Sequence, residues 1–171
     1  MRPTYDPEAV KPMIEELTNI GIESLETAED VDRLVSNTPG TTLLVINSVC
    51  GCAAGSCRPG VVEALQNKLI PDNLGTVFAG VQMEAVERAR ALMPDVQPSS
   101  PNVAIFKDGD LIGVLQRQHI EQMDANGISA ALVKVFDEHC KAEGPSVAPE
   151  VADENEHVDR CGSSIPMYNG E

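Results

Sequence analysis

Two runs of apolar residues predict strands that are covered on both faces. Residues 41–47 (TTLLVIN) and 76–80 (TVFAG) are nearly continuous in hydrophobic and β-branched side chains. Such runs are typical of strands in the middle of a largely parallel sheet, because helices then lie on both sides of it. We therefore expect a sheet whose centre is inaccessible to water.

A second pair of apolar runs predicts a hairpin. Residues 103–106 and 111–115 are separated by four residues that include Asp108-Gly109. An Asp-Gly pair between two apolar runs favours a tight turn, so these two strands are expected to be antiparallel.

Apolar residues at helical spacing lie before, between and after these strands. Asp6-Pro7 resembles a helix N-cap followed by proline at the first helical position, and Gly21 is a typical stop. The expected helices lie within residues 6–21, 27–39, 58–69, 84–93 and 126–140.

From residue 41 the predicted order is strand, helix, strand, helix, strand, strand, helix. Parallel strands need crossover helices, whereas the hairpin must be antiparallel. The sequence therefore predicts an α/β fold: a mixed sheet of about four strands flanked by helices, with extra N-terminal helices.

The end of the chain has a different pattern. Residues 142–171 contain seven acidic residues and one basic residue and show no apolar periodicity. We interpret residues 1–141 as the folded domain and residues 142–171 as an acidic, flexible C-terminal tail.

Charge and composition narrow the classes of function. The formal net charge is −15, which disfavours binding to nucleic acid and to anionic membranes, since both need basic surfaces. No long apolar stretch and no signal-peptide pattern is present at the start of the sequence, so a cytoplasmic location is expected. In the cytosol the five cysteines are expected to be reactive or metal-binding rather than a structural disulfide framework.

The candidate chemistry lies in the loop after the first buried strand, which contains Cys50-Gly51-Cys52. Ligands in such sheets bind beyond the carboxyl ends of strands. A helix is expected to begin within a few residues, and its free N–H groups would stabilise a thiolate, which is the nucleophilic form of cysteine. Arg58 is a candidate for an additional positive charge.

The short Cys-Gly-Cys spacing has a geometric consequence. A fully extended pair two residues apart lies at or beyond the Cα–Cα distance that a disulfide spans, so the bridge requires a tight bend at Gly51. We expect a strained, easily reduced disulfide, which favours removal of small thiols or isomerisation over strong reduction.

Several segments together resemble the bacilliredoxins, over roughly residues 5–140. The matching segments are Val45-Ile46-Asn47-Ser48-Val49-Cys50-Gly51-Cys52-Ala53-Ala54-Gly55, Arg58-Pro59, Pro71-Asp72-Asn73, Val77-Phe78-Ala79-Gly80, Pro98-Ser99-Ser100-Pro101 and His139-Cys140. The resemblance implies a thioredoxin-like fold, with a cis proline at Ser100-Pro101 just before the third core strand.

The resemblance also implies a function: removal of bacillithiol, or a similar low-molecular-weight thiol, from mixed disulfides of client proteins, with isomerase activity in some members. Cys50 would be the attacking thiol and Cys52 the resolving thiol. The small thiol is a co-substrate, and no other cofactor and no metal is expected. Cys57 and the long tail depart from the better-known members, so Cys57 is either an ordinary residue of the first helical turn or an alternative resolving thiol.

Two other classes of function stay open at this stage. The cluster of Cys50, Cys52 and Cys57 has thiolates that zinc or an iron–sulfur cluster would bind. A redox-responsive adaptor that uses its acidic tail as a partner-binding arm is the other. Cys140 is interpreted as a structural residue, and Cys161 as an incidental cysteine of the tail.

Overall fold

The computed structural model describes residues 1–160 and 162–170. The α-helices are α1 (Pro7–Thr18), α2 (Ala28–Val31), α3 (Arg58–Ala64), α4 (Met83–Ala91), α5 (Arg117–Ile120), α6 (Ala125–His139) and α7 (Pro149–Glu154). Two π-helical turns, η1 (Asp32–Ser36) and η2 (Ala53–Cys57), and a 3₁₀ turn, η3 (Gly162–Ser164), complete the helical elements of this part of the chain.

The strands form two sheets. They are β1 (Glu23–Ser24), β2 (Thr41–Asn47), β3 (Leu69–Ile70), β4 (Asn73–Phe78), β5 (Asn102–Lys107), β6 (Asp110–Leu115) and β7 (Ala142–Glu143). The main sheet has the order β1-β4-β2-β5-β6, in which β2 is parallel to β4 and antiparallel to β5. A small second sheet pairs β3 with β7.

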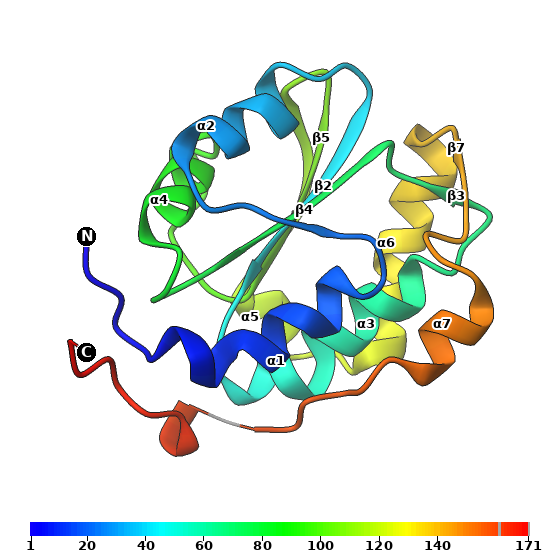
Figure 1. Ribbon diagram of the computed structural model, residues 1–171. Coiled ribbons are helices and arrows are strands. Elements are labelled where there is room, and N and C mark those ends of the chain that lie inside the picture. Colours follow the sequence, from blue (N-terminus) through cyan, green and yellow to red (C-terminus); the bar gives the residue numbers. More distant parts are fainter. Residues whose placement is uncertain (161, 171) are drawn as a thin grey trace.

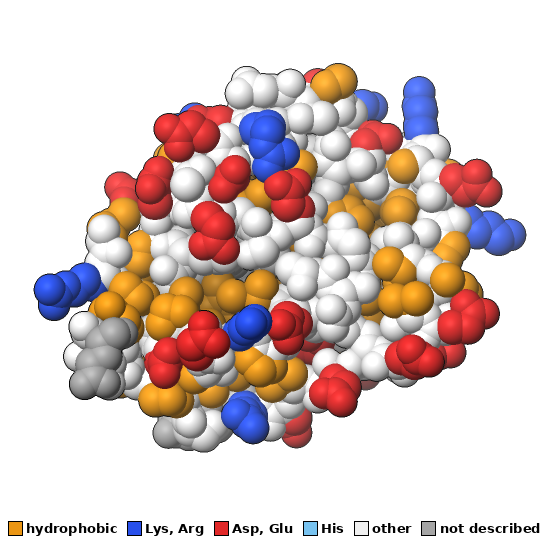
Figure 2. All heavy atoms as spheres, in the orientation of Figure 1, with side chains coloured by type: hydrophobic (Ala, Val, Ile, Leu, Met, Phe, Trp, Pro, Cys, Tyr) orange, Lys and Arg blue, Asp and Glu red, His pale blue; other side chains and the backbone are white. Residues whose placement is uncertain are grey.

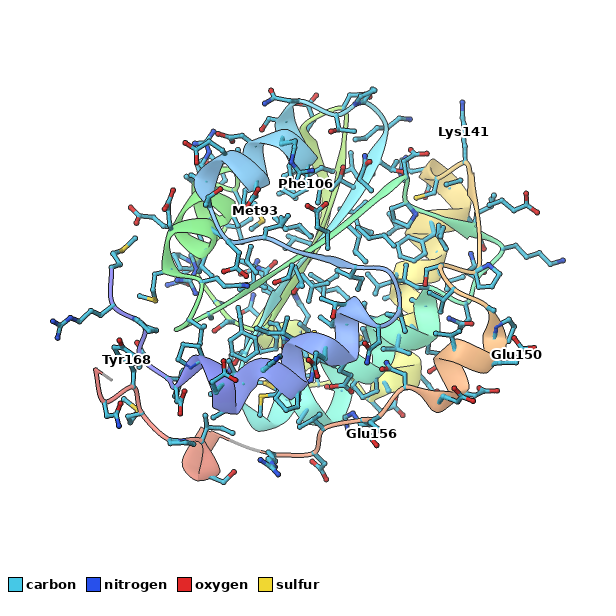
Figure 3. All side chains as sticks on the ribbon, viewed as in Figure 1. Met93, Phe106, Lys141, Glu150, Glu156 and Tyr168 are labelled. Atoms are coloured by element: carbon cyan, nitrogen blue, oxygen red, sulfur yellow. The ribbon has the colours of Figure 1, made fainter. Side chains whose placement is uncertain are left out.

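Helices cover both faces of the main sheet (Figure 1). On one face, α2, η1 and α4 enclose a cluster that includes Leu44, Phe106 and Met93, and Figure 3 labels the last two. On the other face, α1, α3 and α6 pack over Leu43, Val45 and their neighbours. Every residue of β2 is buried, as its apolar sequence predicts.

The predicted mixed sheet with flanking helices is confirmed, and its arrangement is thioredoxin-like. The hairpin forms where the Asp-Gly pair predicts it: Asp108 has φ 50° and Gly109 has φ 86° between β5 and β6. The peptide bond between Ser100 and Pro101 is cis and directly precedes β5.

Three local differences from the sequence prediction follow from tertiary pairing. Short β1 adds a fifth strand, because residues 23 and 24 pair with the edge of β4. The third expected helix ends at Ala64, and Leu69 instead enters β3 and pairs with β7. The short helix α5 after the hairpin was not anticipated. Each of these differences involves a short segment, and the local sequence pattern predicts such segments poorly.

The C-terminal residues lie against the domain, which the expectation of a flexible tail does not anticipate. Ser146 donates a backbone hydrogen bond to Leu65, and Tyr168 donates one to Thr4. Ile165 is buried in a cluster with Val49. These contacts extend the packed unit beyond residue 141. Cys161 and Glu171 lie outside the described residues.

Acidic side chains are spread over the surface, with several over α2 and several near α7 (Figure 2). Within residues 1–160 and 162–170, no helix is long and apolar enough to cross a membrane.

Candidate active site

Three strand ends meet at one edge of the main sheet. The register pairs Ile46 of β2 with Asn102 of β5, and Val103 of β5 with Leu115 of β6. The loop after β2, the Ser100–Pro101 bond before β5 and the residues after β6 therefore lie at the same edge. This is the lower end of β2 in Figure 1.

Cys50 and Cys52 lie at the start of the helix that follows β2. Both are free, partly exposed thiols, with their Sγ atoms 2.8 Å apart. Their helix continues through the π-helical turn η2 into α3, and Ser56 Oγ donates to the carbonyl of Cys52 at 3.0 Å. The predicted helix start beside the thiols is confirmed. One helix thus carries both sulfurs at its amino end.

The surroundings of Cys50 favour its thiolate. Burial alone raises the pKa of Cys50, but hydrogen bonds from the Cys52 thiol, the Ser48 side chain and the Ala53 backbone N–H, together with the Arg117 charge, lower it overall. The Ala53 N–H belongs to the first helical turn and also donates to the Cys50 carbonyl at 3.1 Å. Cys50 is therefore the more acidic thiol of the pair.

The surroundings of Cys52 have the opposite effect and raise its pKa. Burial, the hydrogen bond to Cys50 and the negative charge of Cys50 raise the pKa of Cys52 to about 11. Two of these three causes depend on Cys50, so ionisation of Cys50 disfavours ionisation of Cys52. Thiolate formation at Cys50 thus keeps Cys52 protonated.

The other described cysteines lie in the core. Cys57 is fully buried at the end of η2, and burial raises its pKa to about 12. Cys140 caps α6, and burial raises its pKa as well. A buried neutral thiol is a poor nucleophile, so this geometry supports neither residue as a partner of Cys50. Cys161, which the sequence analysis interprets as an incidental cysteine of the tail, lies outside the described residues.

Arg58 does not have the role that the sequence suggested for it. Its side chain is 0% exposed, and its Nε donates to Glu16 at 2.5 Å. Its Nη1 donates to Asn47 Oδ1 at 3.1 Å and to the Ser48 carbonyl at 3.0 Å. The guanidinium therefore braces the backbone of the loop, and the cation that acts on Cys50 is Arg117 instead.

Sequence reasoning missed Arg117. It follows β6 by two residues, donates from Nη1 to the Ser100 carbonyl at 3.3 Å and forms an ion pair with Glu121 at 2.7 Å. The hairpin register could have revealed that Arg117 lies at the site. Extending the pairing past Val103 and Leu115 places Arg117 opposite Pro101. Ser100 and Pro101 thus join the site, since the Ser100 carbonyl helps to hold Arg117.

A polar hollow of about 220 Å³ includes Arg117 in its lining. Its lining includes Gln97, Ser99, Gln116, Gln118, Arg117 and Glu121. Arg117 faces both this hollow and the thiol pair, because its charge acts on Cys50 and Cys52. The hollow offers amide, hydroxyl and charged groups, and Arg117 links it to the thiol pair.

The three loop cysteines do not make a metal-ligand set in the part of the chain that the structure describes. No group of three or more His, Cys, Asp or Glu side chains there could hold a metal ion. Cys57 is buried in the core cluster against which Cys52 packs.

Comparison with known proteins gives the class. A family model described as disulphide isomerase matches residues 5–140. A bacilliredoxin of Cytophaga hutchinsonii is 48% identical over 134 residues, which cover 78% of this chain and 98% of the relative. A bacilliredoxin of Staphylococcus aureus is 44% identical over 126 residues, covering 74% and 86% respectively. The chain belongs to the bacilliredoxin family and is a thiol–disulfide oxidoreductase of thioredoxin-like fold.

Solved structures with similar folds include a thioredoxin variant from Halobacterium salinarum. It is 17% identical, with a TM-score of 0.48, and the match covers 74% of this chain and 96% of the other. The match to the family model ends at Cys140, so residues 141–171 lie outside it.

Proposed function

We propose that this protein removes bacillithiol, or a similar low-molecular-weight thiol, from mixed disulfides on client proteins in the cytoplasm. The observation that carries the proposal is a pair of thiols at a helix start whose pKa values are shifted in opposite directions. The pKa of Cys50 is lowered, and that of Cys52 is raised to about 11. Such a pair separates the attacking thiol from the resolving one.

The first step transfers the small thiol. The Cys50 thiolate attacks the sulfur of the small thiol in the client mixed disulfide, and a new S–S bond forms as the old one breaks. The client leaves as a thiolate, so the number of disulfides does not change. A low thiol pKa also makes Cys50 a good leaving group in the next exchange.

The second step begins once Cys50 is bonded. Cys52 then no longer faces a thiolate, so two of the causes that raise its pKa disappear. Deprotonated Cys52 attacks Cys50 Sγ, forms the Cys50–Cys52 disulfide and releases the small thiol as its thiolate. Two further small thiols then reduce that disulfide by successive exchanges and leave as their own disulfide.

The polar hollow supports a small-thiol substrate. Its glutamines and Ser99 can donate and accept hydrogen bonds, while Arg117 supplies positive charge. The client would contact the exposed rim around the thiols.

Isomerisation of client disulfides is a second candidate activity, and it would use the same thiolate. Burial still raises the pKa of Cys52 when Cys50 is bonded, and slower resolution leaves the mixed disulfide between Cys50 and a client time to rearrange.

Release of a small thiol from a thiolated client tests the proposal with Cys50→Ser and Cys52→Ser variants. We expect Cys50→Ser to lose transfer by at least about a hundredfold, because no other described thiol is both exposed and acidic. Cys52→Ser should complete one transfer and then accumulate protein carrying the small thiol on Cys50, visible by mass spectrometry.

A Cys140→Ser variant is the matched control, since it removes a buried thiol and should retain transfer. Full transfer by Cys50→Ser would contradict the proposal. So would a small thiol trapped on a residue other than Cys50.

A further inference from the structure

The last part of the chain lies along the edge of the sheet that carries the site. We call residues 155–160 and 162–168 the C-terminal strap. They lie outside residues 5–140, which match the family model. In Figure 1 this orange-to-red segment passes beneath α1, close to the helix that starts at the thiols.

One end of the strap contacts the buried ion pair of Arg58 and Glu16. Arg58 Nη2 donates to the Val158 carbonyl at 2.9 Å. His157 Nδ1 contacts Glu16 Oε1, and Asn155 Nδ2 donates to the Glu16 carbonyl at 2.7 Å. The side chains of Arg58 and Glu16 are 0% and 2% exposed, and the strap contacts both of them.

The other end of the strap packs beside the loop. Ile165 is buried in a cluster with Val49, which directly precedes Cys50. Gly162 approaches the same residue so closely that a Cβ on it would lie 3.2 Å from Val49 Cγ2. Tyr5 and Met167 then form an isolated β-bridge. The strap is thus anchored on both sides of its passage over the loop.

A short series of hydrogen bonds leads from Arg58 to Cys50. Arg58 holds the Asn47 side chain and the Ser48 carbonyl. Asn47 Oδ1 also accepts from the Ser48 N–H at 2.8 Å, and Ser48 Oγ accepts from the Cys50 N–H at 3.1 Å. The position of the guanidinium therefore sets the position of Ser48, which hydrogen-bonds to the Cys50 thiol.

We propose that the C-terminal strap controls the reactivity of Cys50 by holding Arg58, a positioning residue, against the loop that carries the thiol. Without the strap, the guanidinium loses the Val158 carbonyl, Glu16 loses His157, and water reaches both charges. The ion pair then weakens in the higher dielectric, and Ser48 is held less firmly. The proposal rests on Cys50 as the attacking thiol.

Two variants of the full protein release the strap in different ways, both in a Cys161→Ser background so that the tail contributes no thiol. A stop after Glu154 removes the strap but keeps β7 and α7. Ile165→Asp keeps the chain length and places a charge in the apolar cluster around Val49, which drives the strap away from its site.

Glu156→Ala is the matched control. Glu156 is an exposed residue of the strap, and its labelled side chain points away from the domain (Figure 3). Urea unfolding of each variant checks that the domain remains folded, so that a local effect can be separated from general destabilisation.

The readouts are the pH profile of Cys50 alkylation and hydrogen exchange of the amides of residues 48–50. Both strap variants should alkylate at least about threefold more slowly than the control at pH 7 and converge with it at high pH, where the thiol is ionised in every variant. Their loop amides should exchange at least about tenfold faster, because local opening costs less free energy.

Equal pH profiles and equal exchange in the two strap variants and the control would overturn the proposal. Failure of the proposed function is a different result: Cys50→Ser would then still transfer the small thiol, whatever the strap variants do. A dead Cys50→Ser variant together with unchanged strap variants would refute the strap proposal alone.

Discussion

The chemistry at Cys50 arises from several weak contributions rather than from one strong charge. Hydrogen bonds from Cys52, Ser48 and Ala53 come before the charge of Arg117 among the causes that lower its pKa. The sequence shows where these cysteines lie and that a helix follows them. It does not show which cation approaches, because Arg117 is distant in sequence and reaches the site through the hairpin register.

Arg117→Ala tests the electrostatic contribution. Loss of the charge should raise the pKa of Cys50, so less thiolate is present below that pKa and alkylation at pH 7 slows by a factor of about three. The difference should vanish once the pH exceeds the Cys50 pKa in both proteins, because both thiols are then ionised.

Arg88→Ala is the control for that change. Arg88 pairs with Asp32 on the helices α4 and η1, and its loss should leave the alkylation profile unchanged. An Arg117→Ala profile identical to that of the original protein would refute the role given to Arg117.

The elements of the fold were predictable to different degrees. Strands β2 and β4 and the β5–β6 hairpin follow from apolar runs and an Asp-Gly turn, which are local signals. The two-residue strands β1, β3 and β7 form only because distant partners lie beside them. Likewise, the π-helical turn η2 has no local sequence signature, although it shapes the helix that carries the thiols.

The turn of the hairpin gives a test at this scale. Gly109 has φ 86°, which an alanine adopts only with strain, so Gly109→Ala should lower the free energy of unfolding by about 1 kcal/mol. Urea unfolding measures the loss, and small-thiol transfer should persist because the turn lies at the far end of the strands from the thiols.

Gly113→Ala is the matched control in the same hairpin. A Cβ there would meet no atom within 4 Å, and Gly113 is not among the glycines with positive φ. Its unfolding free energy should change by less than about 0.5 kcal/mol. Equal losses in the two variants would contradict the conformational explanation.

At the scale of the whole molecule, the sequence predicted the domain but not the placement of its C-terminal residues. The acidic composition of residues 142–171 favours a flexible tail, yet Ile165 is buried and the Val158 carbonyl binds Arg58. Single apolar residues in a polar segment have no periodicity, so nothing in the local pattern marks them as contacts. The complementary partners, Val49 and the Arg58–Glu16 pair, lie a hundred or more residues earlier.

The central claim is that Cys50 is the acidic, attacking thiol of the pair. Its direct test is site-resolved alkylation of the reduced protein across pH, with each cysteine quantified by mass spectrometry. Cys50 should react first and at the lowest pH, Cys52 should react only at higher pH or after Cys50 is modified, and Cys57 should remain protected while the protein is folded. Reaction of Cys52 or Cys57 at a lower pH than Cys50 would contradict the account.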